Sequence, residues 1–164
     1  MRRAILTLTV FLSTLLSFSL LFASSVSADG HEQDEARVKY RQTVMGGIGN
    51  NMGAIGAIMK NRLGMSDAIA IHANQMAESA ALIAPAFKRR LLDAPNDAQP
   101  EIWDDWAKFE EAIATYEEKA RALAAAAAGG DAKATGAAVQ ALGKSCGGCH
   151  KPFRKPKEES YKDQ

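Results

Sequence analysis

Apolar residues recur every three or four positions through most of the chain, which is the spacing of one face of an amphipathic helix. In the first such stretch they are Met45, Ile48, Met52, Ile55 and Met59. Three further stripes with the same period follow, and almost no segment alternates as a half-buried strand would. The pattern therefore predicts four helices, over residues 34–61, 66–87, 100–128 and 131–153.

Residues that favour helix ends mark several of the boundaries. Ser66 is expected to cap the second helix and Asp131 the fourth, because a short polar side chain accepts hydrogen bonds from N–H groups of the first turn. Gly129 and Gly130 end the third helix, and the charged tail from Lys155 onward is expected to fray. Short connections favour antiparallel neighbours. The expected fold is all-α, an antiparallel up-down-up-down four-helix bundle.

The first helix contains five glycines, each of which costs about 1 kcal/mol relative to alanine in a helix interior. They occupy positions 46, 47, 49, 53 and 56. Such a helix is either weak and mobile, or it leaves room for a flat or bulky group that approaches the backbone closely. The C-terminal motif described below favours the second interpretation.

The N-terminus has the three parts of a secretory signal. Arg2 and Arg3 precede a long uncharged, largely apolar stretch that ends in small residues before Asp29. We expect cleavage after Ala28, which gives a signal peptide over residues 1–28 and a helical domain over 29–164. The stretch is also long enough to span a bilayer, so an uncleaved membrane anchor is the alternative. Its serine and threonine residues and its small-residue exit favour cleavage, after which no membrane span remains.

Charge and length narrow the class of protein. The full chain of 164 residues carries 20 Lys and Arg against 19 Asp and Glu. The predicted signal contains two arginines and no acid, so the mature chain of 136 residues has 18 basic and 19 acidic side chains. This near balance argues against a nucleic-acid-binding protein, which usually shows a basic excess. A domain of this size can bury a core without disulfides.

Both cysteines of the chain lie in one pentapeptide, Cys146-Gly147-Gly148-Cys149-His150. The Cys-x-x-Cys-His sequence is typical of covalent c-type haem attachment. On a helix, Cys146 and Cys149 project from the same side, so each thiol can add to one vinyl group of the porphyrin. His150 follows on that side and can ligate the iron. We therefore expect one covalent haem c, with His150 as an axial ligand of its iron.

Three other interpretations of the two cysteines are weaker. A thioredoxin-like dithiol needs a βαβ setting, and the pattern predicts no such strands. A zinc site needs a fourth ligand; His31 lies at the mature N-terminus and His72 on another helix, so neither is an obvious partner. A purely structural pair would not require the adjacent histidine. We expect His72 to be partly buried or on the surface and His31 to be solvated.

Taken together, these features resemble the class II c-type cytochromes, the cytochrome c′ family. Three segments carry the resemblance: the CxxCHxx[FY][RK] ending from Cys146 to Arg154, the first-helix segments 40–45 and 51–52, and the third-helix start from Pro100 to Phe109. They span nearly all of the mature chain. The resemblance implies that the four-helix bundle encloses the covalently attached haem.

The resemblance also places Met45 over the haem face opposite His150. Typical members have five-coordinate iron with an apolar side chain over the sixth site, whereas in low-spin relatives a methionine here ligates the iron. Some five-coordinate members carry methionine too, so packing stays open, but the glycines beside Met45 favour ligation, and His/Met pairs are common in cytochrome c. Arg41 resembles the family arginine near a haem propionate; a solvated arginine is the alternative.

Two functions follow. The first is a periplasmic electron-transfer cytochrome, not an enzyme, because no catalytic constellation is visible. The alternative is a five-coordinate protein that binds nitric oxide or carbon monoxide at an open distal site; a thiol oxidoreductase is a weaker third. Expected partners are redox proteins of the periplasm, and the resemblance allows a homodimer through the first two helices. Basic residues that could steer an acidic redox partner are Lys144, Lys151, Arg154, Lys155 and Lys157.

Overall fold

The structure, a computed structural model, describes residues 25–161, in which every element is helical. Most of the predicted signal peptide, residues 1–24, lies outside the described residues. The helices are α2 (Ser25–Asn61), α3 (Ser66–Phe87), α4 (Glu101–Asp104), α5 (Trp106–Ala128), α6 (Ala132–Phe153) and the 3-10 helix η1 (Lys157–Glu159). None of them is long and apolar enough to cross a membrane.

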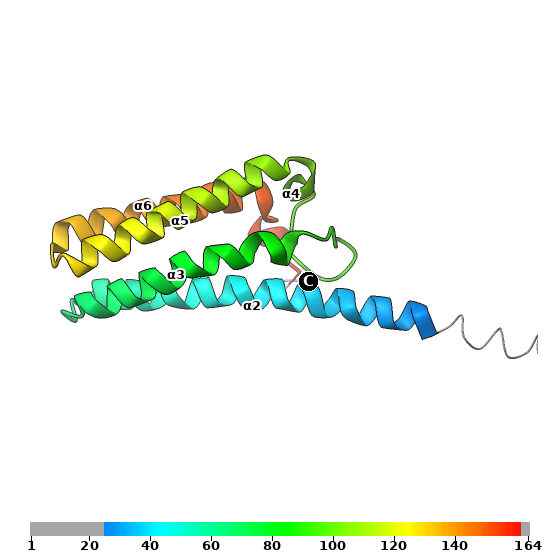
Figure 1. Ribbon diagram of the computed structural model, residues 1–164, viewed down its shortest axis with the longest axis horizontal. Coiled ribbons are helices and arrows are strands. Elements are labelled where there is room, and N and C mark those ends of the chain that lie inside the picture. The colour runs from blue at the N-terminus through cyan, green and yellow to red at the C-terminus, as the bar shows by residue number, and fades with distance from the viewer. Residues whose placement is uncertain (1–24, 162–164) are drawn as a thin grey trace, which may run out of the picture. The chain divides into compact units, whose positions relative to one another are not determined.

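Two compact units divide the chain, Met1–Arg37 and Val38–Gln164, and the bundle belongs to the second. Within that unit α2 runs beside α3, and α5 runs beside α6 (Figure 1). α3 also packs on α5. The predicted all-α four-helix bundle is confirmed, although α2 begins at Ser25 rather than near residue 34.

The predicted third helix is in fact two helices. Asp105 has φ −136° and ψ 68°, which breaks the helix, and its carboxylate accepts a hydrogen bond from the Lys108 N–H at 3.1 Å, capping α5. Ile102 and Phe109 on either side are both buried. Because the apolar stripe continues across the break, periodicity alone does not reveal it.

The other helix boundaries follow the sequence with one exception. Ser66 is not the N-cap of α3: Met65 holds that position, and no side chain caps this end. The cap at Asp131 is confirmed, since its carboxylate accepts from the N–H groups of Lys133 and Ala134 at 2.8 and 3.1 Å. Gly130, with φ 72°, makes the turn that follows α5 in a backbone region that favours glycine.

The core is tightest along one part of the bundle, which we call the packed half. It is defined by six apolar residues with no exposed surface: Ile55, Ala73, Met76, Ala120, Leu123 and Leu142. Small residues of α6 admit methionines of α2 here; a Cβ on Gly136 would lie 3.8 Å from Met59 Cε, and one on Gly143 would lie 3.9 Å from Met52 Cε. A Cβ at either position would make only an ordinary van der Waals contact, so the two methionines of α2 pack on this face of α6 without requiring glycine there.

Hydrogen bonds hold the charged tail in place from Lys155 through Tyr161, so the prediction that it frays was wrong. Lys155 N–H donates to the Asp97 carbonyl at 2.7 Å, and Gln99 N–H donates to the Phe153 carbonyl at 3.0 Å. Ser160 is buried, with 6% of its surface exposed. The tail is held by contacts with residues almost sixty positions earlier in the chain. A local sequence pattern does not predict contacts over such a separation.

Candidate functional site

A cavity of about 740 Å³ opens beside the packed half, within the size range of cofactor pockets. Residues from α2, α3, α4, α5 and α6 line it, together with the α3–α4 connection and the C-terminal tail. Most of the helical lining is apolar: Val38, Met45, Ile48, Met52, Ile83, Phe87, Ile102, Phe109, Ala112, Ile113 and Phe153. An apolar cavity of this size between the helices of a small bundle suits a large flat organic group.

The predicted attachment motif faces this cavity. Cys146 and Cys149, both half-buried, line it from α6, and so does the exposed His150. Both thiols are free. Burial raises the pKa of Cys149 to about 11, with a smaller contribution from Cys146, and burial likewise raises the pKa of Cys146. Both thiols are therefore protonated at neutral pH before any linkage forms.

The electrostatics around His150 suit a metal ligand. Although part of the His150 surface is exposed, partial desolvation by the surrounding protein, and then the nearby charge of Arg154, lower the pKa of His150 below its usual value. The imidazole is thereby held in the neutral form that binds metals. Two thiols one turn apart, an adjacent neutral imidazole and an apolar cavity together fit a covalently attached haem.

Met45 lines the same cavity from α2. The side chain is half-buried and packs at the edge of the core. Gly46 and Gly49 line the cavity beside it, and a Cβ at either position would meet no atom within 4 Å. The protein itself therefore crowds neither glycine, and the free space beside Met45 belongs to the cavity.

Arg41 is buried, with 3% of its surface exposed, although it also lines the cavity. Its guanidinium donates from Nε to the Ala86 carbonyl at 2.8 Å, and from its terminal nitrogens to the carbonyls of Arg89 and Leu91. It also lies over the Phe87 ring, 5.1 Å from the centroid. Arg41 thus joins α2 to the C-terminal end of α3, a role the sequence pattern did not reveal, and its predicted propionate contact stays a prediction.

Aromatic residues divide between the cavity and the core around it. Phe109 packs against Phe153 and Trp106, with ring centroids 5.2 and 5.5 Å apart. Phe109 and Phe153 line the cavity, whereas neither tryptophan is part of its lining. Trp103 instead donates from Nε1 to the Phe87 carbonyl at 2.7 Å. Both tryptophans pack against the core instead of lining the cavity.

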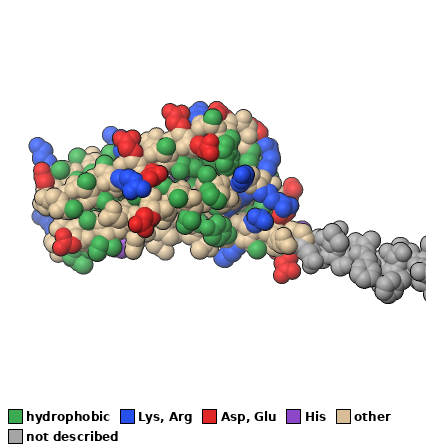
Figure 2. Space-filling model, viewed as in Figure 1, with side chains coloured by type: hydrophobic (Ala, Val, Ile, Leu, Met, Phe, Trp, Pro, Cys, Tyr) green, Lys and Arg blue, Asp and Glu red, His purple; other side chains and the backbone are tan. Residues whose placement is uncertain are grey.

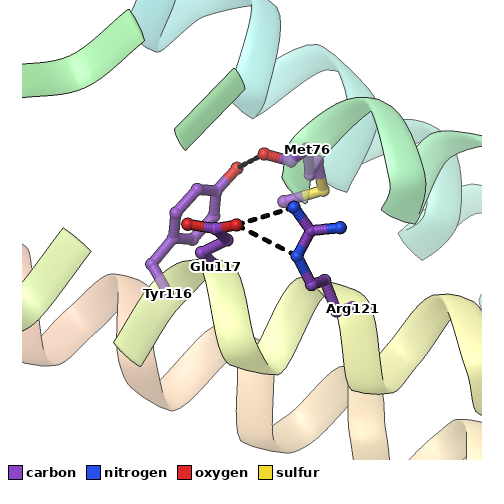
Figure 3. Close-up of polar contacts among 4 residues, drawn as sticks. All are labelled: Met76, Tyr116, Glu117 and Arg121. Carbon is purple, nitrogen blue, oxygen red and sulfur yellow. Dashed lines mark hydrogen bonds and ion pairs between the residues drawn. The ribbon is translucent and has the colours of Figure 1, made fainter. Parts of the chain in front are cut away.

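Tyr116 links the cavity to the packed half. Its hydroxyl donates to the Met76 carbonyl on α3 at 2.8 Å, while the neighbouring Glu117 pairs with Arg121 on the outside of α5 (Figure 3). Burial, and secondarily the nearby Cys146, raise the pKa of Tyr116 well above its ordinary value of 10.0. The phenol therefore stays neutral and fixes α5 to α3 beside the cavity.

Most of the basic residues predicted to steer a partner, and the two histidines outside the motif, do not line the cavity. Basic side chains gather at one end of the face in Figure 2. Of the predicted basic set, only Arg154 and Lys157 line the cavity. His72 is half-buried, with Nδ1 2.7 Å from Asn51 Oδ1, and the His31 side chain is 76% exposed, both as expected.

Known proteins resemble this chain over most of its length. A family model described as Cytochrome C′ matches residues 36–154. Cytochrome c′ of Rhodospirillum rubrum is 37% identical over 120 residues, covering 73% of this chain and 82% of the relative. Cytochrome c-556 of Rhodopseudomonas palustris is 33% identical over 144 residues, covering 82% and 90%.

Solved structures agree with the sequence comparison. A ferrous variant of cytochrome c′ from Alcaligenes xylosoxidans, with nitric oxide bound, superposes with a TM-score of 0.66 at 30% identity. The match covers 76% of this chain and 97% of that one. The family carries a covalently attached haem c, which accounts for the motif and for the cavity that it faces. The chain belongs to the cytochrome c′ family of class II c-type cytochromes.

Proposed function

We propose that this chain is a periplasmic electron carrier, with one haem c held by Cys146 and Cys149 and its iron ligated by His150 and Met45. The observation that carries the proposal is that Met45 and His150 line one cavity from two different helices, α2 and α6. A bound haem supplies one-electron exchange at its iron, and a methionine ligand raises the reduction potential. The protein supplies the ligands and an apolar enclosure.

The choice of Met45 over the other cavity methionine rests on packing. Met52 also lines the cavity, but its Cε lies 3.9 Å from the position of a Cβ on Gly143, so it is engaged with α6. Met45 lies one helical turn before Gly49, where even a Cβ would meet no atom within 4 Å. A thioether that is free to move toward the cavity is the better candidate for a ligand.

Export and partners complete the proposal. The N-terminal signal directs the chain to the periplasm, with cleavage after Ala28, and electron transfer there requires a redox protein partner. Arg154 and Lys157 at the cavity would favour an acidic partner surface. A homodimer through α2 and α3 is the assembly that the family resemblance suggests.

A second function is favoured by the relatives whose solved structures hold nitric oxide or carbon monoxide. If Met45 only packs over the cavity, the sixth position of the iron is open to such small ligands. The apolar lining would then exclude charged competitors and admit neutral diatomic molecules. The two functions differ at one side chain, Met45.

The absorption spectrum of the purified holoprotein tests the choice. Ligation by Met45 predicts a low-spin ferrous spectrum with sharp α and β bands, and Met45→Ala should convert it to a high-spin spectrum with rapid carbon monoxide binding. Truncating a half-buried methionine also costs stability, on the order of 2 kcal/mol. A high-spin spectrum in the unchanged protein would contradict ligation and favour gas binding.

Met52→Ala is the matched control, because it removes a second methionine from the same helix and the same cavity. It should lower stability by a similar amount and leave the iron low-spin. If Met52→Ala rather than Met45→Ala changed the spin state, the assignment of the ligand would be wrong while the electron-transfer proposal stood.

A further inference from the structure

Asp97, in the connection between α3 and α4, holds the C-terminal tail at two points. Its carboxylate accepts a hydrogen bond from the Ser160 hydroxyl at 3.1 Å and another from the Tyr161 N–H at 3.0 Å. Its own carbonyl accepts from the Lys155 N–H at 2.7 Å. One residue thus binds both ends of the segment 155–161.

The connection that carries Asp97 is itself fixed. Asn96 is buried, with 6% of its surface exposed, and its amide donates to the Leu91 carbonyl at 3.3 Å. The Asn96 side-chain oxygen accepts from the Ala98 N–H at 2.9 Å. Ala98 pairs in turn with Arg154 in an isolated antiparallel bridge. The tail is therefore held against a braced loop.

The tail and this loop together form one wall of the haem cavity. Lys157, Ser160 and Tyr161 line the cavity from the tail, and Asp97 lines it from the loop. Figure 1 shows the chain continuing past α6 toward the start of the bundle portion of α2. Without the tail, this wall of the cavity would lose the side chains of Lys157, Ser160 and Tyr161.

We propose that Asp97 is a positioning residue that fastens the segment 155–161 across the haem cavity, and that this segment limits access of solvent and small solutes to the haem. The proposal rests on the proposed function only in requiring haem in the cavity; it holds whether or not Met45 ligates the iron. Opening of the segment leaves the helices and the attachment motif in place.

The test measures how fast a small hydrophilic reductant, dithionite, reduces the ferric holoprotein. Asp97→Ala removes both side-chain bonds, so the open population and the reduction rate should rise by about tenfold. Ser160→Ala removes one bond and should raise the rate by roughly threefold. Asp97→Asn keeps an acceptor oxygen and should restore most of the protection.

Amide hydrogen exchange gives a second readout. The Lys155 N–H donates to the main-chain carbonyl of residue 97, which Asp97→Ala retains. Faster exchange at Lys155 in that variant would therefore report release of the whole segment rather than loss of one acceptor. Asp93→Ala is the control, because it removes an exposed carboxylate from the same connection and makes the same change in charge.

Two results would overturn the proposal. One is a reduction rate in Asp97→Ala no higher than in Asp93→Ala. The other is faster exchange at Lys155 with unchanged haem reduction, which would mean that the segment is fastened but is not the barrier. Neither result bears on the spin state, so failure here is distinct from failure of the ligation by Met45.

Discussion

The apolar stripes of α2 and α6 run through both the packed half and the part of the bundle around the cavity, which we call the cavity half. The two halves are nevertheless filled differently. Along α2, Ile55 has no exposed surface, whereas Ile48, two turns earlier, is only half-buried. Along α6, Leu142 has no exposed surface, whereas Cys146, one turn later, is half-buried. The apolar period continues, but no polypeptide fills the cavity half. That half instead holds the cavity of about 740 Å³, whose size and apolar lining suit the covalent haem c of the family.

The difference has an energetic consequence. Burial of apolar surface contributes about 25 cal/mol per Å² removed from water. The packed half gains this from its own side chains, while the cavity half must gain it from the haem. Each half can therefore be weakened separately, and the expected effects run from loss of the haem to loss of one hydrogen bond.

The largest effect should come from Cys146→Ser combined with Cys149→Ser. Neither serine can form a thioether, so the haem should separate from the chain on denaturation, and the stability that a tightly bound ligand provides should fall by several kcal/mol. Absorbance of the denatured, extracted protein measures this. Ser145→Ala, which alters the neighbouring residue but neither thiol, should keep the haem attached. Retention of haem by the double variant would refute covalent attachment through these residues.

A smaller loss of stability is expected from truncating one apolar side chain in each half, and the two losses compare the halves directly. Leu142→Ala opens a cavity in the packed half and should cost about 3 kcal/mol with or without haem. Ile48→Ala should cost only about 1 kcal/mol in the haem-free protein, because much of that side chain already faces the open cavity, and more when haem is present. Denaturant unfolding measures both. Equal losses in the haem-free protein would show that the cavity half closes on itself.

The smallest effect is expected for the hydrogen bond between Tyr116, which lines the cavity, and Met76 of the packed half. Tyr116→Phe removes the donor to the Met76 carbonyl and should cost about 1 kcal/mol. Because burial raises the pKa of Tyr116 above 10.0, its contribution is complete below pH 10 and is lost as the pH rises further. The variant should lose that alkaline dependence. Tyr40→Phe, at a residue that is 48% exposed, should change neither quantity.

Local patterns predicted the helices well because periodicity and capping are local properties. The apolar stripes located the helices, and Asp131 behaved as a cap. The break at Asp105 was missed because buried residues on both sides keep the same period. The tail was missed because its partner, Asp97, lies about sixty positions earlier in the chain, and because its charged composition resembles that of an end that frays.

The sequence by itself determined the chemistry: a Cys-x-x-Cys-His motif on an amphipathic helix commits two thiols and an imidazole to one side of that helix. It also determined the bundle, since four apolar stripes must be buried against one another. Only the tertiary structure decided what surrounds the motif. The long-range bonds of Arg41 to the end of α3, and of Asp97 to the tail, depend on which surfaces meet after folding, and no spacing along the chain encodes them.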